Sequence, residues 1–244
     1  MTSPRLLFVH ALSPLHAGTG QSIGAIDLAI ARDRATQFPY LPGSSLKGSL
    51  RDVAAEKIPD AAIRKKLFGP AVQDNPSEHA GALIVSDANL LLLPVRSVAG
   101  TFAWVTSPYL LHRFRRDLES AKPQGALAVP AGMALPTNLT ECTVGANSSL
   151  VAKVKHHKTG KDEDKIIFED LDLVPKKQTE LDKFAADLGQ LIFANDTFWQ
   201  DSLARRLCVV HDDVMTFLSE HATDVVARIA LEEGIKTVKE GALW

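Results

Sequence analysis

Two cations in the sequence lie four residues apart at the start of a predicted helix. Lys47 and Arg51 follow a glycine and two serines, which suit a loop that opens a helix. Residues four apart share a helix face, Ser44 or Ser45 can cap the helix, and its free N–H groups favour a phosphate. The predicted phosphate-binding site therefore consists of Gly43, Ser44, Ser45, Lys47 and Arg51. A solvated helix face is the alternative interpretation of the two cations.

A glycine-rich loop precedes this segment but does not match the common nucleotide motifs. After Gly18-Thr-Gly20, the dinucleotide fingerprint needs a third glycine where this chain has Ile23. The following residues 25–31 alternate like a strand, whereas the fingerprint needs a helix. The segment 42–47 lacks the leading glycine of a Walker A loop. These residues favour a polyanion backbone as the ligand over a mononucleotide.

The same stretch carries a resemblance to a known family. The motif H-A-L-S-P-L-H-A-G-T-G-Q-S-I-G-A-I-D-L, followed by F-P-Y-L-P-G-S-S-L-K-G-S-L-R, resembles the RAMP superfamily of CRISPR proteins. Within that superfamily it is similar to the backbone subunits of type III-B (Cmr) effector complexes. Supporting motifs are Leu67-Phe-Gly-Pro70, Val85-Ser-Asp-Ala-Asn-Leu90 and Phe102-Ala-Trp-Val-Thr-Ser-Pro108. The resemblance spans nearly the whole chain and is looser over residues 121–207.

The resemblance implies one catalytic residue in the strand after the glycine loop, and the position of a histidine before that loop suggests a second. The cleaving aspartate of the family corresponds to Asp27. It implies that Asp27 holds Mg²⁺ or Mn²⁺, which can activate the attacking oxygen and offset charge on the phosphate. His16 is a second catalytic candidate that can orient a phosphate or move a proton. The alternatives are a solvated aspartate on the polar face of a strand, and a histidine that packs against the loop or caps it.

For function, the resemblance implies a guide-RNA-binding subunit of an RNA-guided complex that cuts complementary target RNA at regular intervals. Copies would stack head to tail along one crRNA, beside the other subunits of the effector. Further RNA-binding candidates are Gly18, Gly20 and Arg96, although Arg96 also suits a salt bridge at a strand end. A structural guide-binding subunit without nuclease activity is the alternative. A metal-free guide-processing nuclease is disfavoured, because Gly234 and Gly241 do not reproduce its C-terminal glycine-rich motif.

Hydrophobic periodicity predicts the elements that position these residues. The helices predicted lie at 44–57, 61–68, 108–120, 179–193 and from 212 or 213 to 221; the strands lie at 6–12, 25–31, 83–93, 101–106 and 206–210. Residues 122–149 are rich in proline, glycine and small residues and are expected to be mostly loop. Hairpins are expected over 150–168 and 224–238.

Strands and helices interleave without long parallel repeats, which predicts an α+β fold. The resemblance implies one RAMP domain over residues 1–244, with a ferredoxin-like, RRM-related core, insertions and a protruding β-hairpin thumb. The thumb is expected within about residues 150–208, at Leu150–Phe168 or Asp196–Cys208. The chain stops on Trp244, and we expect a C-terminal piece beyond it.

The composition limits how this chain can bind RNA and where in the cell we expect it. The 244 residues carry a net charge of −2, so any RNA contact must come from a local patch. Cys142 and Cys208 make neither a disulfide framework nor a zinc pattern, and a reducing cytosol is the simplest setting. No apolar run approaches membrane-spanning length. We therefore expect a cytoplasmic protein.

Overall fold

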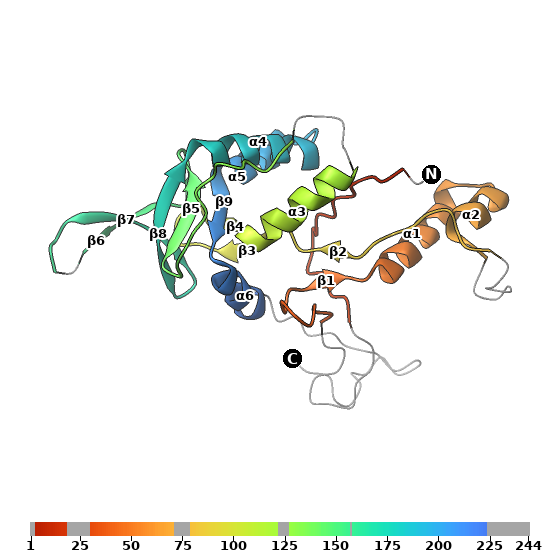
Figure 1. Ribbon diagram of the computed structural model, residues 1–244, viewed down its shortest axis with the longest axis horizontal. Helices are drawn as coiled ribbons and strands as arrows, with labels where there is room; N and C mark the ends of the chain where they lie inside the picture. The colour runs from red at the N-terminus through yellow and green to blue at the C-terminus, as the bar shows by residue number, and fades with distance from the viewer. Residues whose placement is uncertain (1–2, 19–29, 71–78, 122–126, 157, 224–244) are drawn as a thin grey trace, which may run out of the picture. The chain divides into compact units, whose positions relative to one another are not determined.

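The computed structural model describes residues 3–18, 30–70, 79–121, 127–156 and 158–223 (Figure 1). The chain divides into two compact units, one made of Met1–Leu15 with Leu91–Trp244 and the other of His16–Leu90. These two units lie inside what the sequence predicted as a single domain. None of the described helices is both long enough and apolar enough to cross a membrane.

A mixed β-sheet forms the larger unit. Within the described residues it has seven strands in the order β3-β4-β9-β5-β8-β7-β6. The pairs β4/β9 and β5/β8 are parallel, and the other neighbours are antiparallel. The strands are β3 (Leu93–Arg96), β4 (Phe102–Thr106), β5 (Glu141–Gly145), β6 (Ala152–Lys155), β7 (Asp162–Phe168), β8 (Leu171–Gln178) and β9 (Leu207–Val210).

Helices α3 (Pro108–Ala121), α4 (Thr179–Ile192) and α5 (Thr197–Arg206) build the main core with β4 and β9. The periodicity of α4 is confirmed at Leu181, Phe184 and Leu188, which are fully buried. Leu191, expected on the same face, is instead 40% exposed. Helix α6 (Asp212–His221) follows β9, and all four residues of β9 are buried. The predicted α+β class is confirmed, whereas its ferredoxin-like detail stays a prediction.

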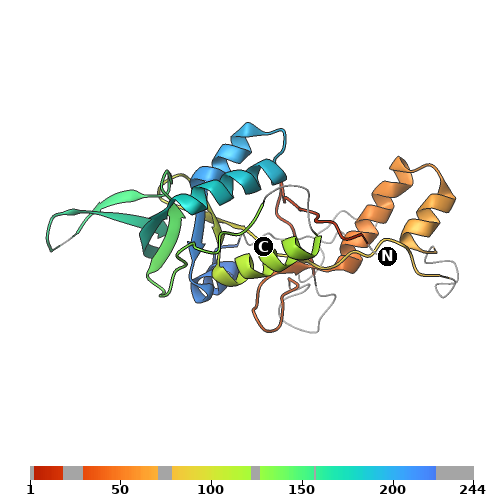
Figure 2. The same ribbon diagram turned by 45° about the horizontal axis from the view of Figure 1, so that its top comes forward.

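The hairpin predicted over residues 150–168 is present as β6 and β7. The two strands pair antiparallel, with Lys153 opposite Asp164 and Lys155 opposite Asp162. In Figure 2 the hairpin extends past the end of the neighbouring strands of its sheet. The other candidate segment, Asp196–Cys208, forms helix α5 and the start of β9. The first segment is therefore the one with the shape of a thumb.

The smaller unit contains a short ribbon and two helices. Strands β1 (Tyr40–Leu41) and β2 (Ala88–Asn89) pair antiparallel. Helix α1 (Gly43–Lys57) follows β1, and α2 (Ala61–Phe68) follows after a short connection. Asp60 caps α2 by accepting hydrogen bonds from the backbone N–H groups of Ala62 and Ile63. Both helix predictions in this region are confirmed.

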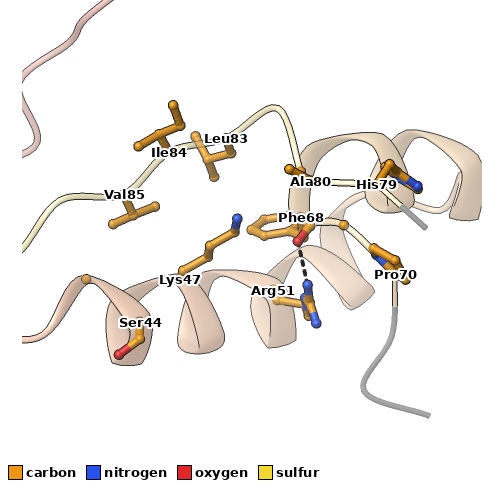
Figure 3. A pocket seen from close by; sticks show the side chains of 13 residues that line it. Ser44, Lys47, Arg51, Phe68, Pro70, His79, Ala80, Leu83, Ile84 and Val85 are labelled. Atoms are coloured by element: carbon orange, nitrogen blue, oxygen red, sulfur yellow. Dashed lines mark hydrogen bonds between the residues drawn. The ribbon is translucent and has the colours of Figure 1, made fainter. Parts of the chain in front are cut away.

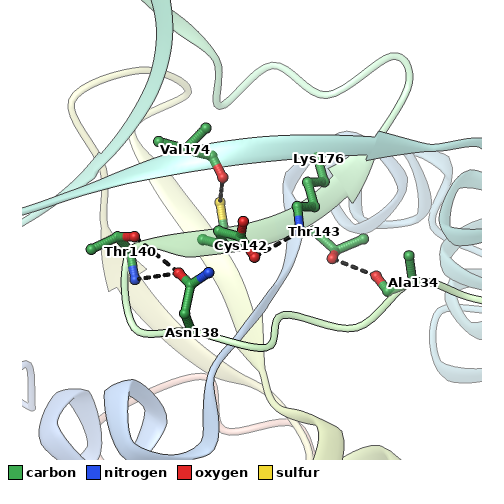
Figure 4. Close-up of polar contacts among 8 residues, drawn as sticks. Ala134, Asn138, Thr140, Cys142, Thr143, Val174 and Lys176 are labelled. Atoms are coloured by element: carbon green, nitrogen blue, oxygen red, sulfur yellow. Dashed lines mark hydrogen bonds and ion pairs between the residues drawn. The ribbon is translucent and has the colours of Figure 1, made fainter.

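Strand β5 is an exception within residues 127–149, which are otherwise in neither helix nor strand, as the expectation of mostly loop required. Its residues Cys142 and Val144 are fully buried between β9 and β8. The Thr143 hydroxyl, also buried, donates to the Ala134 carbonyl at 2.7 Å, which ties the preceding loop to the strand (Figure 4). Strand β5 is buried by its neighbouring strands and by this loop. Its own short sequence of mostly small residues does not predict that burial.

Two strand predictions are wrong. Residues 6–12 are not in a strand, and Leu7 and Leu12 are 65% and 87% exposed. Of residues 83–93, only Ala88–Asn89 and the first residue of β3 are in strands. An apolar run does not by itself provide a hydrogen-bonding partner strand, and most of these two segments have none among the described residues. Of the strand predicted at 25–31, residues 25–29 lie outside the described residues, and so does the predicted C-terminal hairpin from 224 onward.

Candidate functional site

An open pocket of about 500 Å³ lies in the smaller unit, between helix α1, the end of α2 and the segment that leads to β2. Figure 3 shows Lys47 extending from α1 toward the segment with Leu83, Ile84 and Val85, whereas the Ser44 hydroxyl points away from that segment. The pocket is lined by Gly43, Ser44, Lys47, Arg51, Phe68, Gly69, Pro70, His79, Ala80, Gly81, Leu83, Ile84 and Val85. Four of the five residues predicted for the phosphate site therefore share one pocket.

Helix α1 begins differently from the sequence prediction. Its N-cap is Pro42, with φ −58° and ψ 131°, and no side chain caps it. Ser44 and Ser45 lie inside the first turn, so the prediction that either of them caps the helix is wrong. Proline fits this position because its fixed φ suits a helix entry and it has no N–H group to satisfy. Ser45 is exposed and does not line the pocket.

The first N–H group of α1 already has an anionic partner. Gly43 donates its backbone N–H to the Asp87 carboxylate at 2.7 Å. A Cβ atom at Gly43 would lie 2.4 Å from the carbonyl oxygen of Val85, so only glycine fits this approach. The helix start predicted to bind a phosphate is thus partly occupied by a carboxylate of the same unit.

The two cations have different surroundings. The Arg51 guanidinium donates to the Phe68 carbonyl at 2.5 Å and lies 6.0 Å from the centre of the Phe68 ring. It thereby binds a backbone acceptor at the last residue of α2. Lys47 lies one turn earlier and is half-buried, and among the described residues its amine has no hydrogen bond or ion pair. Lys47 is therefore the cation that is available to a ligand.

The remaining predicted residues are placed as follows. Gly18 pairs with Ile30, and Ala31 donates to the Ala17 carbonyl at 2.6 Å, so the two described ends of the glycine loop meet. His16 is half-buried at the base of this loop. Gly20 and Asp27 lie outside the described residues. Arg96 is exposed on β3 in the other unit, so it is not part of the pocket.

No ready metal site is present in the part of the chain that the structure describes. There, no group of three or more His, Cys, Asp or Glu side chains could hold a metal ion. Cys142 and Cys208 are both free and buried. Burial raises the pKa of the Cys208 thiol, and the neighbouring Cys142 raises it further. This thiol is suited to packing and not to metal binding or nucleophilic attack.

Charged side chains do interact on the hairpin. Asp164 pairs with Lys153 across β6 and β7, and Lys177 on β8 lies 3.0 Å from the same carboxylate. The hydrogen bond from Lys153 lowers the pKa of Asp164, and the one from Lys177 lowers it further. The hairpin therefore offers a partly neutralised surface, since each of these lysines is matched by acid.

Several residues in the pocket or in contact with its lining were not predicted as site residues. Phe68 and Asp87 belong to the motifs Leu67-Phe-Gly-Pro70 and Val85-Ser-Asp-Ala-Asn-Leu90, which were used only to support the family resemblance. His79 had no sequence signal, and its ring lies 3.2 Å from the Lys65 carbonyl. The signal for Phe68 and Asp87 was thus their presence in the family motifs. Their contacts with Arg51 and Gly43 exist only in three dimensions.

The fold and the pocket define an α+β protein with a cationic pocket in its smaller unit. The chain belongs to the RAMP superfamily, whose family model matches residues 8–244. It is 34% identical over 243 residues to the CRISPR system Cmr endoribonuclease Cmr4 of Pyrococcus furiosus, covering 98% of this chain and 75% of that protein. The predicted family is confirmed.

Two further comparisons agree with this family. A 53-residue stretch, 20% of this chain and 25% of the relative, is 42% identical to the CRISPR system Cms endoribonuclease Csm3 of Enterococcus italicus. Oligomeric Cmr4 from Pyrococcus furiosus, a crystal structure, matches with a TM-score of 0.63 and 28% identity. That match covers 88% of this chain and 71% of the other.

Proposed function

We propose that this chain is a guide-RNA-binding backbone subunit of a type III-B CRISPR effector and an endoribonuclease acting on complementary target RNA. The observation that carries this proposal is the 34% identity, over 98% of the chain, to a protein named as a Cmr endoribonuclease. An identity spread over the whole chain supports a shared role better than a match confined to one motif.

The pocket supplies a physical basis for guide binding. Lys47 brings an ammonium group without a partner among the described residues to a half-buried position in the pocket. A point charge with three donors suits a phosphate oxygen. Such contacts hold the backbone and leave bases free, so that pairing with the guide supplies sequence specificity. Arg51 contributes by holding the end of α2 in place and by lining the same pocket.

The cleavage chemistry belongs to Asp27 and His16. Asp27 is the candidate ligand of Mg²⁺ or Mn²⁺, and when bound such an ion would activate the attacking oxygen and offset charge on the phosphate. Mg²⁺ usually keeps several waters and binds phosphate oxygens beside one or two carboxylates, so this ion would also take oxygens from the RNA. His16, at the base of the loop, would orient the scissile phosphate or carry a proton.

Assembly completes the proposal. The relative Cmr4 from Pyrococcus furiosus is described as oligomeric. A head-to-tail contact between identical copies is heterologous and builds a filament when it does not close. The β6–β7 hairpin is the segment that would act as the thumb of each copy. Regularly spaced copies, each carrying one Asp27, would cut target RNA at regular intervals.

Cleavage of target RNA by the guide-loaded assembly tests the proposal. Wild type, Asp27→Ala and Asp27→Asn are compared with and without Mg²⁺, and target binding is measured in parallel. We expect a ladder of regularly spaced products that disappears with either variant or with EDTA, while target binding persists. His16→Ala is expected to slow cutting by about 100-fold, as for loss of a general acid or base.

The other outcomes are equally informative. A ladder that survives both Asp27 variants would move the chemistry to another residue. Cutting that resists EDTA would remove the metal from the proposal. Tight guide binding with no cutting at all would leave a structural subunit, and a failure to bind guide RNA would overturn the proposed function as a whole.

A further inference from the structure

The contact between Asp87 and Gly43 joins residues 44 positions apart in the sequence, at the edge of the candidate pocket. Asp87 Oδ1 lies 2.7 Å from the backbone nitrogen of Gly43, the first residue of α1. Gly43 itself lines the pocket, whereas Asp87 does not. The carboxylate therefore reaches the helix start from outside the pocket.

The surrounding backbone fixes this contact. Leu41 pairs with Ala88 in the β1–β2 ribbon, directly beside the two residues concerned. A Cβ atom at Gly43 would lie 2.4 Å from the Val85 carbonyl oxygen and 2.8 Å from that of Ser86. The helix start is thus pressed against residues 85–87, which places the aspartate where the free N–H group points.

Helix α1 has no other anionic partner of its own at this end. Its first turn contains no acidic residue, and Pro42 provides no side-chain cap. A negative charge at a helix N-terminus is stabilising because it complements the helix dipole. Asp87 supplies from a distant segment what the local sequence of α1 lacks.

We propose that Asp87 is a positioning residue for guide RNA, which occupies the first N–H group of α1 and directs the guide phosphate to Lys47. This inference rests on the proposed function. A phosphate at the helix start would meet a like charge and lose that N–H donor. One turn further along α1, the Lys47 amine is a cationic donor of the pocket that has no hydrogen bond or ion pair among the described residues.

Amide hydrogen exchange tests the contact without RNA. The Gly43 amide is followed by NMR in wild type, Asp87→Asn and Asp87→Ala. Asparagine keeps an oxygen acceptor of the same size and removes the charge, so it is the matched control for the hydrogen bond. We expect Gly43 to be protected in wild type and in Asp87→Asn and to exchange at least about tenfold faster in Asp87→Ala. Equal exchange in all three would overturn the contact.

Guide-RNA binding tests whether the charge of Asp87 directs the phosphate to Lys47. Lys47→Ala is expected to weaken guide RNA binding by about tenfold, as for a hydrogen bond to a charged group. In an Asp87→Ala background the freed Gly43 N–H group can donate to a phosphate oxygen, so the same Lys47→Ala change should weaken binding by about threefold or less. Asp87→Asn alone should tighten binding by about two- to threefold, because a like charge is removed while the helix start stays in place.

The possible failures can be told apart. If wild type binds no guide RNA, the proposed function fails and the role of Asp87 toward RNA fails with it. If guide binding is tight but the effects of Lys47→Ala and Asp87→Ala are additive, Asp87 does not direct the phosphate and only this inference is overturned. If Asp87→Asn weakens guide binding, the carboxylate itself assists binding, and that result also overturns this inference.

Discussion

Gly43 and Gly48 belong to the same helix but have opposite surroundings. A Cβ atom at Gly43 would meet the backbone of Val85 and Ser86 at 2.4–2.8 Å, whereas one at Gly48 would meet nothing within 4 Å. Alanine at Gly43 must push two backbone segments apart, which costs about 1–3 kcal/mol. Alanine at Gly48 should instead stabilise the helix by about 0.5–1 kcal/mol, since glycine is unfavourable in a helix interior.

Urea unfolding of the two alanine variants measures this difference. We expect the midpoint to fall for Gly43→Ala and to rise for Gly48→Ala relative to wild type. Similar midpoints for both variants would mean that the helix start is not packed against residues 85–87. That result would also weaken the case for Asp87, because its contact with Gly43 depends on the same close approach.

Lys47 and Arg51 show how far residue types predicted the site. Their spacing placed both on one face of α1, and the structure confirms that they line the same pocket. Spacing could not show that Arg51 bonds to the Phe68 carbonyl, because that partner comes from another helix. The Asp87 contact was equally hidden, since it spans 44 residues and depends on tertiary packing.

At the scale of elements, local signals decided which predictions held. Helices α2 and α4 have an N-cap or a regular apolar period within their own sequence, and both were predicted close to their observed bounds. Strand β5 has neither, because its burial comes from β8, β9 and the Ala134 loop. Residues 6–12 showed the reverse error, an apolar run that has no strand partner among the described residues.

The β6–β7 hairpin carries a prediction about pH. Bonds from Lys153 and Lys177 lower the pKa of Asp164 in the folded hairpin. A carboxylate whose pKa is lowered by folding stabilises the fold above its unfolded pKa, about 3.9 for aspartate. That contribution is lost as the pH falls below this value and through the lower folded pKa. We therefore expect the hairpin to loosen in this acidic range while remaining unchanged between pH 5 and 8.

Amide exchange of β6 and β7 as a function of pH, corrected for intrinsic rates, measures this loosening. Asp164→Asn should show the faster exchange already at neutral pH and no further change in acid. Glu163→Gln is the matched control, because Glu163 is exposed on the same strand and has no ion pair among the described residues. If Glu163→Gln behaves like Asp164→Asn, net charge and not the lysine pairs would govern the hairpin.

At the scale of the whole molecule, the net charge indicates that several copies must bind one guide RNA together. A chain with a net charge of −2 is not attracted to RNA as a whole, so each copy relies on local contacts such as Lys47. Affinity for a nucleic-acid backbone grows with the number of phosphates neutralised. Several copies on one guide would therefore bind far more firmly than one copy alone.

Guide length is the variable that tests this expectation. We expect the number of copies bound, measured by native mass spectrometry, to increase stepwise as the guide is lengthened at low salt. The dependence of binding on salt should steepen in parallel, because each added copy neutralises further phosphates, with a slope of about 0.7 per phosphate for single strands.

Two lysine variants show whether the pocket binds these phosphates. Lys47→Ala should reduce the salt slope in proportion to the number of copies. Lys57 is an exposed lysine at the end of the same helix and outside the pocket, so Lys57→Ala should leave the slope nearly unchanged. One copy per guide at every length would contradict head-to-tail assembly, and an equal effect of both lysines would place the phosphate outside the pocket.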